Sequence, residues 1–68
     1  MDDFAYQVEM TTRDLSQYVA KDFNYDLEQA LACVYNSKTF EKLNNKNTGL
    51  YFQSPLYVYE YLKEELKK

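Results

Sequence analysis

The scarcity of residues that interrupt helices restricts the fold more than any other feature. The chain has one glycine, Gly49, and one proline, Pro55, in 68 residues. Few chain breakers and many large side chains favour helices over a turn-rich β fold. A chain of 68 residues also leaves room for only one domain with a modest core. The sequence therefore predicts a single all-α domain over residues 1–68, a small bundle of three main helices plus one short helix.

Apolar side chains at spacings of three and four predict the first helix, over residues 3–22. The stripe consists of Phe4, Ala5, Val8, Thr12, Leu15 and Val19. A helix turns a stripe of this kind towards a core. Asp3 suits the positive end of the helix dipole, so we expect the helix to begin there.

Capping residues predict where the second and third helices begin. Asn24 or Asp26 can accept the free backbone N–H groups of a second helix, which we expect to end near residue 36. Ser37 can then cap a short third helix over residues 38–43.

The last third of the chain contains one loop and one helix. Asn and Gly tolerate the left-handed backbone of tight turns, so residues 44–49 are predicted to form a loop. Three large residues at 50–52 are too short a run for a helix, and we expect an extended segment there. Ser54 followed by Pro55 is the usual N-cap and first position of a helix, which predicts a last helix over residues 55–67.

The apolar stripes of these helices predict one shared core. We expect the apolar faces of the first, second and last helices to meet around it. Its members are Val8, Leu15, Val19, Leu27, Leu31, Phe40, Val58, Leu62 and Leu66.

The cysteine and histidine content excludes covalent and metal supports. Cys33 is the only cysteine and the chain has no histidine, so no internal disulfide can form and an ordinary zinc site has almost no ligands. We expect no metal and no cofactor. Cys33 lies next to the apolar face of the second helix, where it should act as a small hydrophobe. The lone thiol, an acidic start and the lack of an apolar run of roughly 20 residues predict a soluble, cytoplasmic protein without a membrane partner.

The same inventory argues against an enzyme. Without histidine, the usual general base at neutral pH is missing and Ser-His or Cys-His nucleophiles cannot be built. A phosphate-binding loop needs several glycines, and Gly49 stands alone. Acid pairs such as Glu60 and Glu64 are interpreted as solvated helix faces. We therefore expect no catalytic residues.

Charge is unevenly distributed along the chain. Residues 1–34 carry seven acids and two bases, a net charge of −5, whereas residues 35–68 carry six lysines and four acids, a net charge of +2. Lys38, Lys42 and Lys46 recur every four residues near aromatic side chains, a pattern that can meet phosphates and bases. A small DNA- or RNA-binding domain is therefore the alternative function, although the acidic total and the single arginine argue against it.

A surplus of aromatic side chains favours a protein-binding role. The chain carries eight tyrosines and four phenylalanines, more rings than a bundle of this size can bury. Tyrosine is enriched at interfaces because it offers a large apolar area with a polar tip. The leading hypothesis is a non-enzymatic interaction module that binds a protein partner or forms a homodimer. The predicted contact residues are Tyr51, Phe52, Tyr57 and Tyr61.

Residues 35–62 also carry a recurring pattern. It comprises Tyr-Asn-Ser at 35–37, Phe-Glu-Lys-Leu at 40–43, Thr-Gly-Leu-Tyr at 48–51, and Ser-Pro at 54–55 leading into Tyr-Val-Tyr-Glu at 57–60. This pattern resembles short bacterial helical proteins of unknown function, some of which look like companions encoded beside toxin genes. The resemblance implies a helical fold and no active site. In an antitoxin-like role, the acidic first half would suit a basic toxin surface.

Overall fold

The computed structural model describes residues 3–67 as a small all-helical bundle without strands, which confirms the predicted fold class. Two of its six helices are short turns of 3₁₀ helix. The elements are α1 (Asp3–Phe23), α2 (Leu27–Tyr35), α3 (Lys38–Leu43), η1 (Lys46–Thr48), η2 (Leu50–Phe52) and α4 (Pro55–Leu66).

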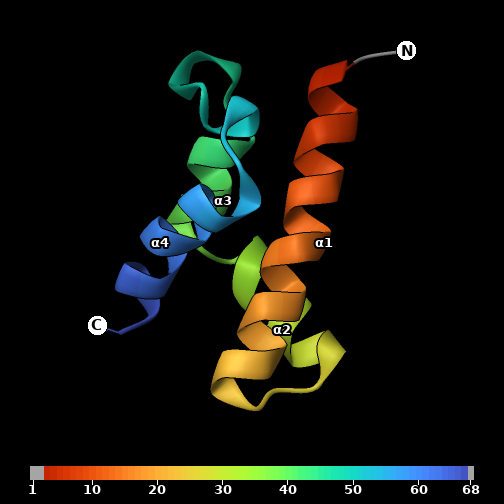
Figure 1. The fold of residues 1–68 in the computed structure, drawn as a ribbon, viewed down its shortest axis with the longest axis vertical. Helices are drawn as coiled ribbons and strands as arrows, with labels where there is room; N and C mark the ends of the chain where they lie inside the picture. The colour runs from red at the N-terminus through yellow and green to blue at the C-terminus, as the bar shows by residue number, and fades with distance from the viewer. Residues whose placement is uncertain (1–2, 68) are drawn as a thin grey trace.

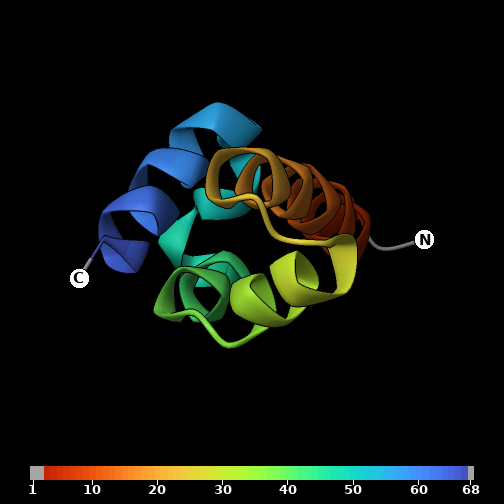
Figure 2. The ribbon, with the colours of Figure 1, turned by 90° about the horizontal axis from the view of Figure 1, so that it is seen from below.

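The helices are arranged around one core. α1 is the longest helix and α2 returns antiparallel beside it, so the two form a hairpin (Figure 1). α3 continues from the end of α2, and α4 packs against both α1 and α3. Seen along the long axis, the four α-helices enclose a common centre (Figure 2). η1 and η2 lie beside the N-terminal part of α1 and close that end of the bundle.

The first helix follows its predicted stripe with one exception. Val8, Thr12, Leu15 and Val19 are buried, and Phe4 is half-buried. Ala5 is exposed, so its assignment to the stripe is wrong. The helix also buries the hydroxyls of Thr12 and Ser16, which donate to the carbonyls of Val8 at 2.7 Å and Thr12 at 2.8 Å. These bonds within α1 satisfy two polar groups that would otherwise be costly to bury.

The predicted caps determine where the helices begin. Asp26 caps α2 by accepting from the N–H of Gln29 at 2.8 Å, and the Gln29 side chain accepts from the N–H of Asp26. Asn24 has a left-handed backbone, φ 58°, which turns the chain between α1 and α2. Ser37 and Ser54 cap α3 and α4 as predicted. Each cap satisfies backbone donors that the first turn of a helix leaves free.

The expectation of an extended segment at residues 50–52 is wrong. Gly49 has φ +73°, a left-handed conformation, and the chain turns there into η2. The N–H groups of Phe52 and Gln53 then donate to the carbonyls of Gly49 and Leu50. An isolated extended segment would leave these backbone groups without partners, whereas the 3₁₀ turn pairs them within three residues. The predicted loop at 44–49 likewise contains a 3₁₀ turn, η1.

The predicted core is correct at its centre and wrong at one edge. Val8, Leu15, Val19, Val58 and Leu62 are buried. Phe40 and Leu66 are half-buried and pack against this core. Leu31 is half-buried without belonging to it, and Leu27 is 57% exposed.

The position of Leu27 has a simple geometric cause. Leu27, Leu31 and Tyr35 recur every four residues along one edge of α2, where they line a groove beside α1. The face of α2 that meets the centre of the bundle instead carries Ala30 and Val34, both fully buried. The core therefore takes the small residues of α2 and leaves its largest aliphatic side chains at the border.

Candidate protein-binding site

Several aromatic side chains are exposed, as the sequence predicts. Five of the eight tyrosines are exposed, with Tyr35 and Tyr6 at 55% and 54%, and Tyr18 and Tyr51 are half-buried. Tyr59 is the exception: it is buried, and its hydroxyl donates to Asp22 of α1 at 2.7 Å. Burial first, and the bond to Asp22 second, raise the pKa of Tyr59 well above its ordinary value.

The predicted contact residues Tyr51 and Phe52 lie in η2. The Tyr51 ring meets the Phe4 ring of α1 edge-on, with 4.8 Å between centroids. Phe52 stacks on Tyr51 at 4.2 Å and is itself 76% exposed. The three rings thus form a row from α1 outwards, in which Tyr51 anchors Phe52 at the surface.

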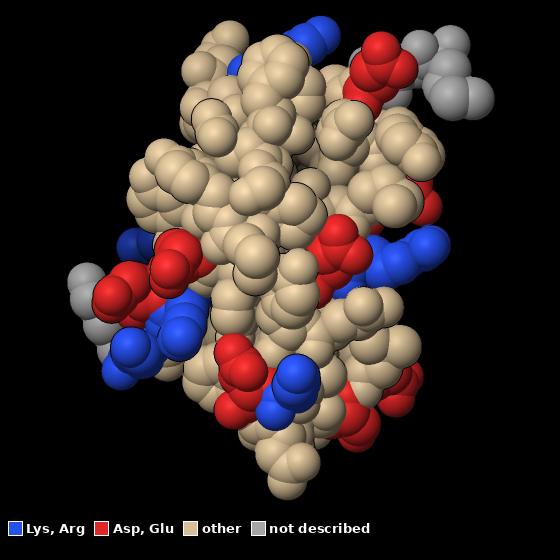
Figure 3. Space-filling model, in the orientation of Figure 1, with Lys and Arg blue, Asp and Glu red and all other residues tan. Residues whose placement is uncertain are grey.

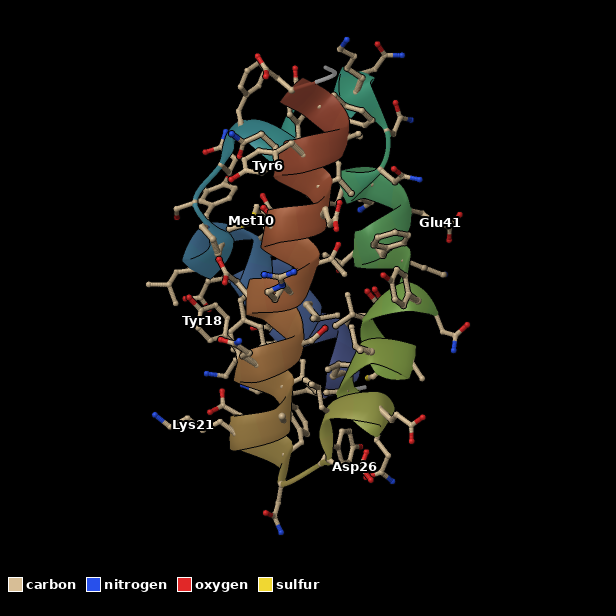
Figure 4. All side chains as sticks on the ribbon, turned by 90° about the vertical axis from the view of Figure 1, so that its right-hand side faces the viewer. Tyr6, Met10, Tyr18, Lys21, Asp26 and Glu41 are labelled. Atoms are coloured by element: carbon tan, nitrogen blue, oxygen red, sulfur yellow. The ribbon has the colours of Figure 1, made fainter. Side chains whose placement is uncertain are left out.

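Phe52 lies on a face with further exposed apolar side chains. Leu56 in the first turn of α4 is 63% exposed, and Tyr6 and Met10 of α1 are also exposed. Tyr6 and Met10 point to the side of α1 on which η2 and the beginning of α4 lie (Figure 4). On this face, the area over η2 and the adjoining parts of α1 and α4 shows no charged side chain, and the charges gather at its margins and over the lower half (Figure 3). We call Tyr6, Met10, Phe52 and Leu56 the Phe52 patch.

The other predicted pair, Tyr57 and Tyr61, forms a separate surface on α4. Their rings meet edge-on with centroids 5.5 Å apart, and their hydroxyl oxygens are 3.3 Å apart. Together with Glu60 and Glu64 they line a shallow groove of about 270 Å³. We call these four residues the α4 groove. The hydrogen bond with Tyr61 raises the pKa of Tyr57.

The predicted four-residue site therefore consists of two surfaces. Tyr51 and Phe52 belong to the face shared with α1, whereas Tyr61 also lines the groove between α3 and α4. Leu56, Tyr6 and Met10 were not among the predicted contact residues. A signal for Leu56 exists, because it falls outside the apolar stripe of its own helix. Nothing in the sequence indicates that Leu56 lies near Tyr6 and Met10 of α1, because that proximity depends on how α4 packs.

The groove between α3 and α4 combines lysines and glutamates. It has a volume of about 440 Å³ and is lined by Lys38, Thr39, Lys42, Tyr61, Glu64 and Glu65. Glu65 reaches across from α4 and accepts from the N–H groups of Lys38 at 2.7 Å and Thr39 at 2.9 Å, and from the Thr39 hydroxyl at 2.8 Å. Burial works to raise the pKa of Glu65, but these bonds and the charge of Lys38 outweigh it, so the pKa lies below its ordinary value.

The three lysines of the nucleic-acid alternative do not form one row. Lys38 and Lys42 share the groove with Glu64 and Glu65. α3 ends at Leu43, and the ammonium group of Lys46 instead lies 5.8 Å from the centre of the Phe4 ring. Nearby carboxylates weaken attraction to phosphates, so this arrangement does not favour DNA or RNA binding. That function stays a prediction.

Residues 3–67 contain no group of three or more Cys, Asp or Glu side chains that could hold a metal ion. Cys33 is half-buried against the core, and burial raises the pKa of its thiol, which suits a structural residue. None of the helices within residues 3–67 combines the length and apolar character that crossing a membrane requires.

Comparison with known proteins adds no relationship. No protein-family model, no curated protein and no solved structure matches this chain.

Proposed function

We propose that this chain is a non-enzymatic protein-interaction module that pairs with a second copy of itself through the Phe52 patch. The observation that carries the proposal is the exposure of Phe52 and Leu56, at 76% and 63%, close together in η2 and the first turn of α4. Apolar side chains gathered in this way on a small surface are typical of an interface. An antitoxin-like companion, the role that the resemblance of residues 35–62 implies, belongs to the same class because it acts by binding.

The size of the chain supports pairing. A chain this short has a modest core, and small domains commonly need a disulfide, a metal or a partner subunit for stability. Cys33 is the only cysteine in the sequence, so a disulfide within the chain cannot supply that support. A second copy would add buried apolar area without any change to the fold.

The charge distribution supports a second copy as the occupant. The chain has a net charge of −3, so two copies repel one another unless the contact avoids their acids. Two copies related by a two-fold axis present the same patch to each other, and the area over η2 shows no charged side chain that would repel its counterpart (Figure 3). A stable interface buries roughly 800 Å² per partner, about a sixth of the 4902 Å² that this chain exposes.

Light scattering after size exclusion, from micromolar to millimolar protein, tests the proposal. We expect the mass to rise from monomer to dimer, and the double variant Phe52→Ser and Leu56→Ser to remain a monomer throughout. Added salt should change the midpoint little, because the contact is mainly apolar.

Leu27→Ser combined with Tyr35→Ser is the matched control. These two side chains are also more than half exposed, at 57% and 55%, but lie on the edge of α2. The control should form dimers like the original chain, with all three proteins equally helical by circular dichroism. If the original chain stays a monomer at every concentration, the proposal is wrong. It is also wrong if the α2 control no longer forms the dimer while the Phe52 and Leu56 variant still does.

A further inference from the structure

The α4 groove joins two kinds of side chain on one helical face. Tyr57, Glu60, Tyr61 and Glu64 follow one another at intervals of three and one residues, which places all four on the same side of α4. They alone line the groove of about 270 Å³. Two aromatic rings therefore adjoin two carboxylates in a single hollow.

The two rings are held in a defined arrangement. Their centroids are 5.5 Å apart at an interplanar angle of 65°, and the hydroxyl oxygens lie 3.3 Å apart. The shared hydrogen bond and the helix backbone fix each ring relative to the other. The groove therefore requires little ordering of side chains when a ligand enters.

The two carboxylates of the groove are available to a ligand. Glu60 and Glu64 are exposed, and neither makes a hydrogen bond or an ion pair within residues 3–67. Their neighbour Glu65 differs, because the first turn of α3 already occupies its carboxylate. Lysines lie on both sides of this pair: Lys38 and Lys42 line a groove with Glu64, and Lys21 and Lys63 line one with Glu60.

We propose that the α4 groove binds an arginine side chain of a protein partner. The negative face of an aromatic ring attracts a cation, and the carboxylates of Glu60 and Glu64 supply two acceptors for its N–H groups. A guanidinium is planar, stacks on rings and donates in several directions, whereas the compact lysine ammonium is more strongly hydrated. Lysines flank the groove on both sides, Lys38 and Lys42 beside Glu64 and Lys63 beside Glu60. They would repel a second cation, so the groove fits one arginine rather than a run of basic residues.

This inference rests on the proposed function, because it names the chemistry of a protein that an interaction module contacts. The two surfaces adjoin on α4, because Leu56 of the Phe52 patch and Glu60 of the α4 groove line a common pocket. A dimer formed through the patch would present two α4 grooves to a basic partner.

Nuclear magnetic resonance titration of the full chain with N-acetylarginine methylamide tests the inference. We expect the backbone amide signals of residues 57–64 to shift with a dissociation constant in the millimolar range. The citrulline analogue has the same shape without the charge, and it should leave these signals in place. The lysine analogue should bind the same residues roughly threefold more weakly.

Two pairs of variants separate the ring and carboxylate contributions. Glu60→Gln with Glu64→Gln should weaken arginine binding roughly fivefold, whereas Glu28→Gln with Glu41→Gln, two exposed acids outside the groove, should not change it. Tyr61→Leu retains an apolar side chain but lacks the ring face and should weaken binding roughly threefold. Its control is Tyr6→Leu on α1.

No shift of residues 57–64 at a large excess of the arginine probe would overturn the inference. Equal shifts with citrulline, or equal loss of affinity in the Glu28 and Glu41 control, would overturn it as well. In either case the dimer measurement with the Phe52 and Leu56 variant stands, so failure of this inference is distinguishable from failure of the proposed function.

Discussion

Glu65 shows how one side chain can hold a short helix in place. A helix of six residues is too short to form alone, and its first turn leaves backbone N–H groups unpaired. In α3, Glu65 accepts from the N–H groups of Lys38 and Thr39, and Ser37 accepts from that of Phe40 at 3.0 Å. All three donors are thus satisfied, and the carboxylate lies at the positive end of the helix.

Replacing Glu65 with glutamine should therefore destabilise the fold by about 1 to 2 kcal/mol, because the charge-assisted bonds to α3 are weakened. Urea unfolding measured by circular dichroism at neutral pH gives this value. Glu64→Gln is the matched control, since Glu64 is exposed and caps no helix, and we expect it to change stability little.

The pKa of Glu65 adds a dependence on pH. Folding lowers this pKa, so the carboxylate stabilises the folded state above its unfolded pKa, and that contribution is lost as the pH falls through the folded value. An ordinary carboxyl group titrates between roughly pH 6 and pH 3. Over this range, the original chain should lose more stability than the Glu65→Gln variant does. Parallel losses in the two proteins would show that other acids carry the effect.

At the scale of elements, the turn at Gly49 determines where η2 and its rings lie. Its φ of +73° is a conformation that residues with a Cβ rarely adopt, and a Cβ built there would meet no atom within 4 Å. Any loss on substitution therefore comes from the backbone and not from a clash. The turn matters for the proposed interface because Phe52 follows three residues later.

Gly49→Ala should cost about 1 kcal/mol of stability, and Gly49→Asn clearly less, because asparagine tolerates the left-handed conformation. Urea unfolding curves of both variants against the original chain measure the difference. Equal losses for alanine and asparagine would contradict a purely conformational cost.

At the scale of the whole molecule, pairing links association to stability. If only the folded chain pairs, the dimer removes folded monomer from the unfolding equilibrium, and the melting temperature rises with protein concentration. We expect this rise in the original chain and a constant melting temperature in the variant Phe52→Ser and Leu56→Ser. Scanning calorimetry over a concentration series measures both. A constant value for the original chain would count against pairing.

The sequence by itself determined most of the local structure. Caps at Asp26, Ser37 and Ser54 and the apolar stripe of α1 predict the four α-helices, because a helix start and an amphipathic face depend on residues a few positions apart. Composition predicted the exposed tyrosines, because a core of this size cannot bury all the aromatic rings of the chain.

Only the tertiary structure decided which distant residues meet. It placed Leu27 at the border of the bundle and brought Glu65 to the first turn of α3. It also divided the predicted aromatic site between two surfaces. Phe52 stacks on Tyr51, which packs on α1, whereas Tyr61 lines the groove between α4 and α3. Such contacts depend on how whole helices pack, and no spacing within one helix encodes that.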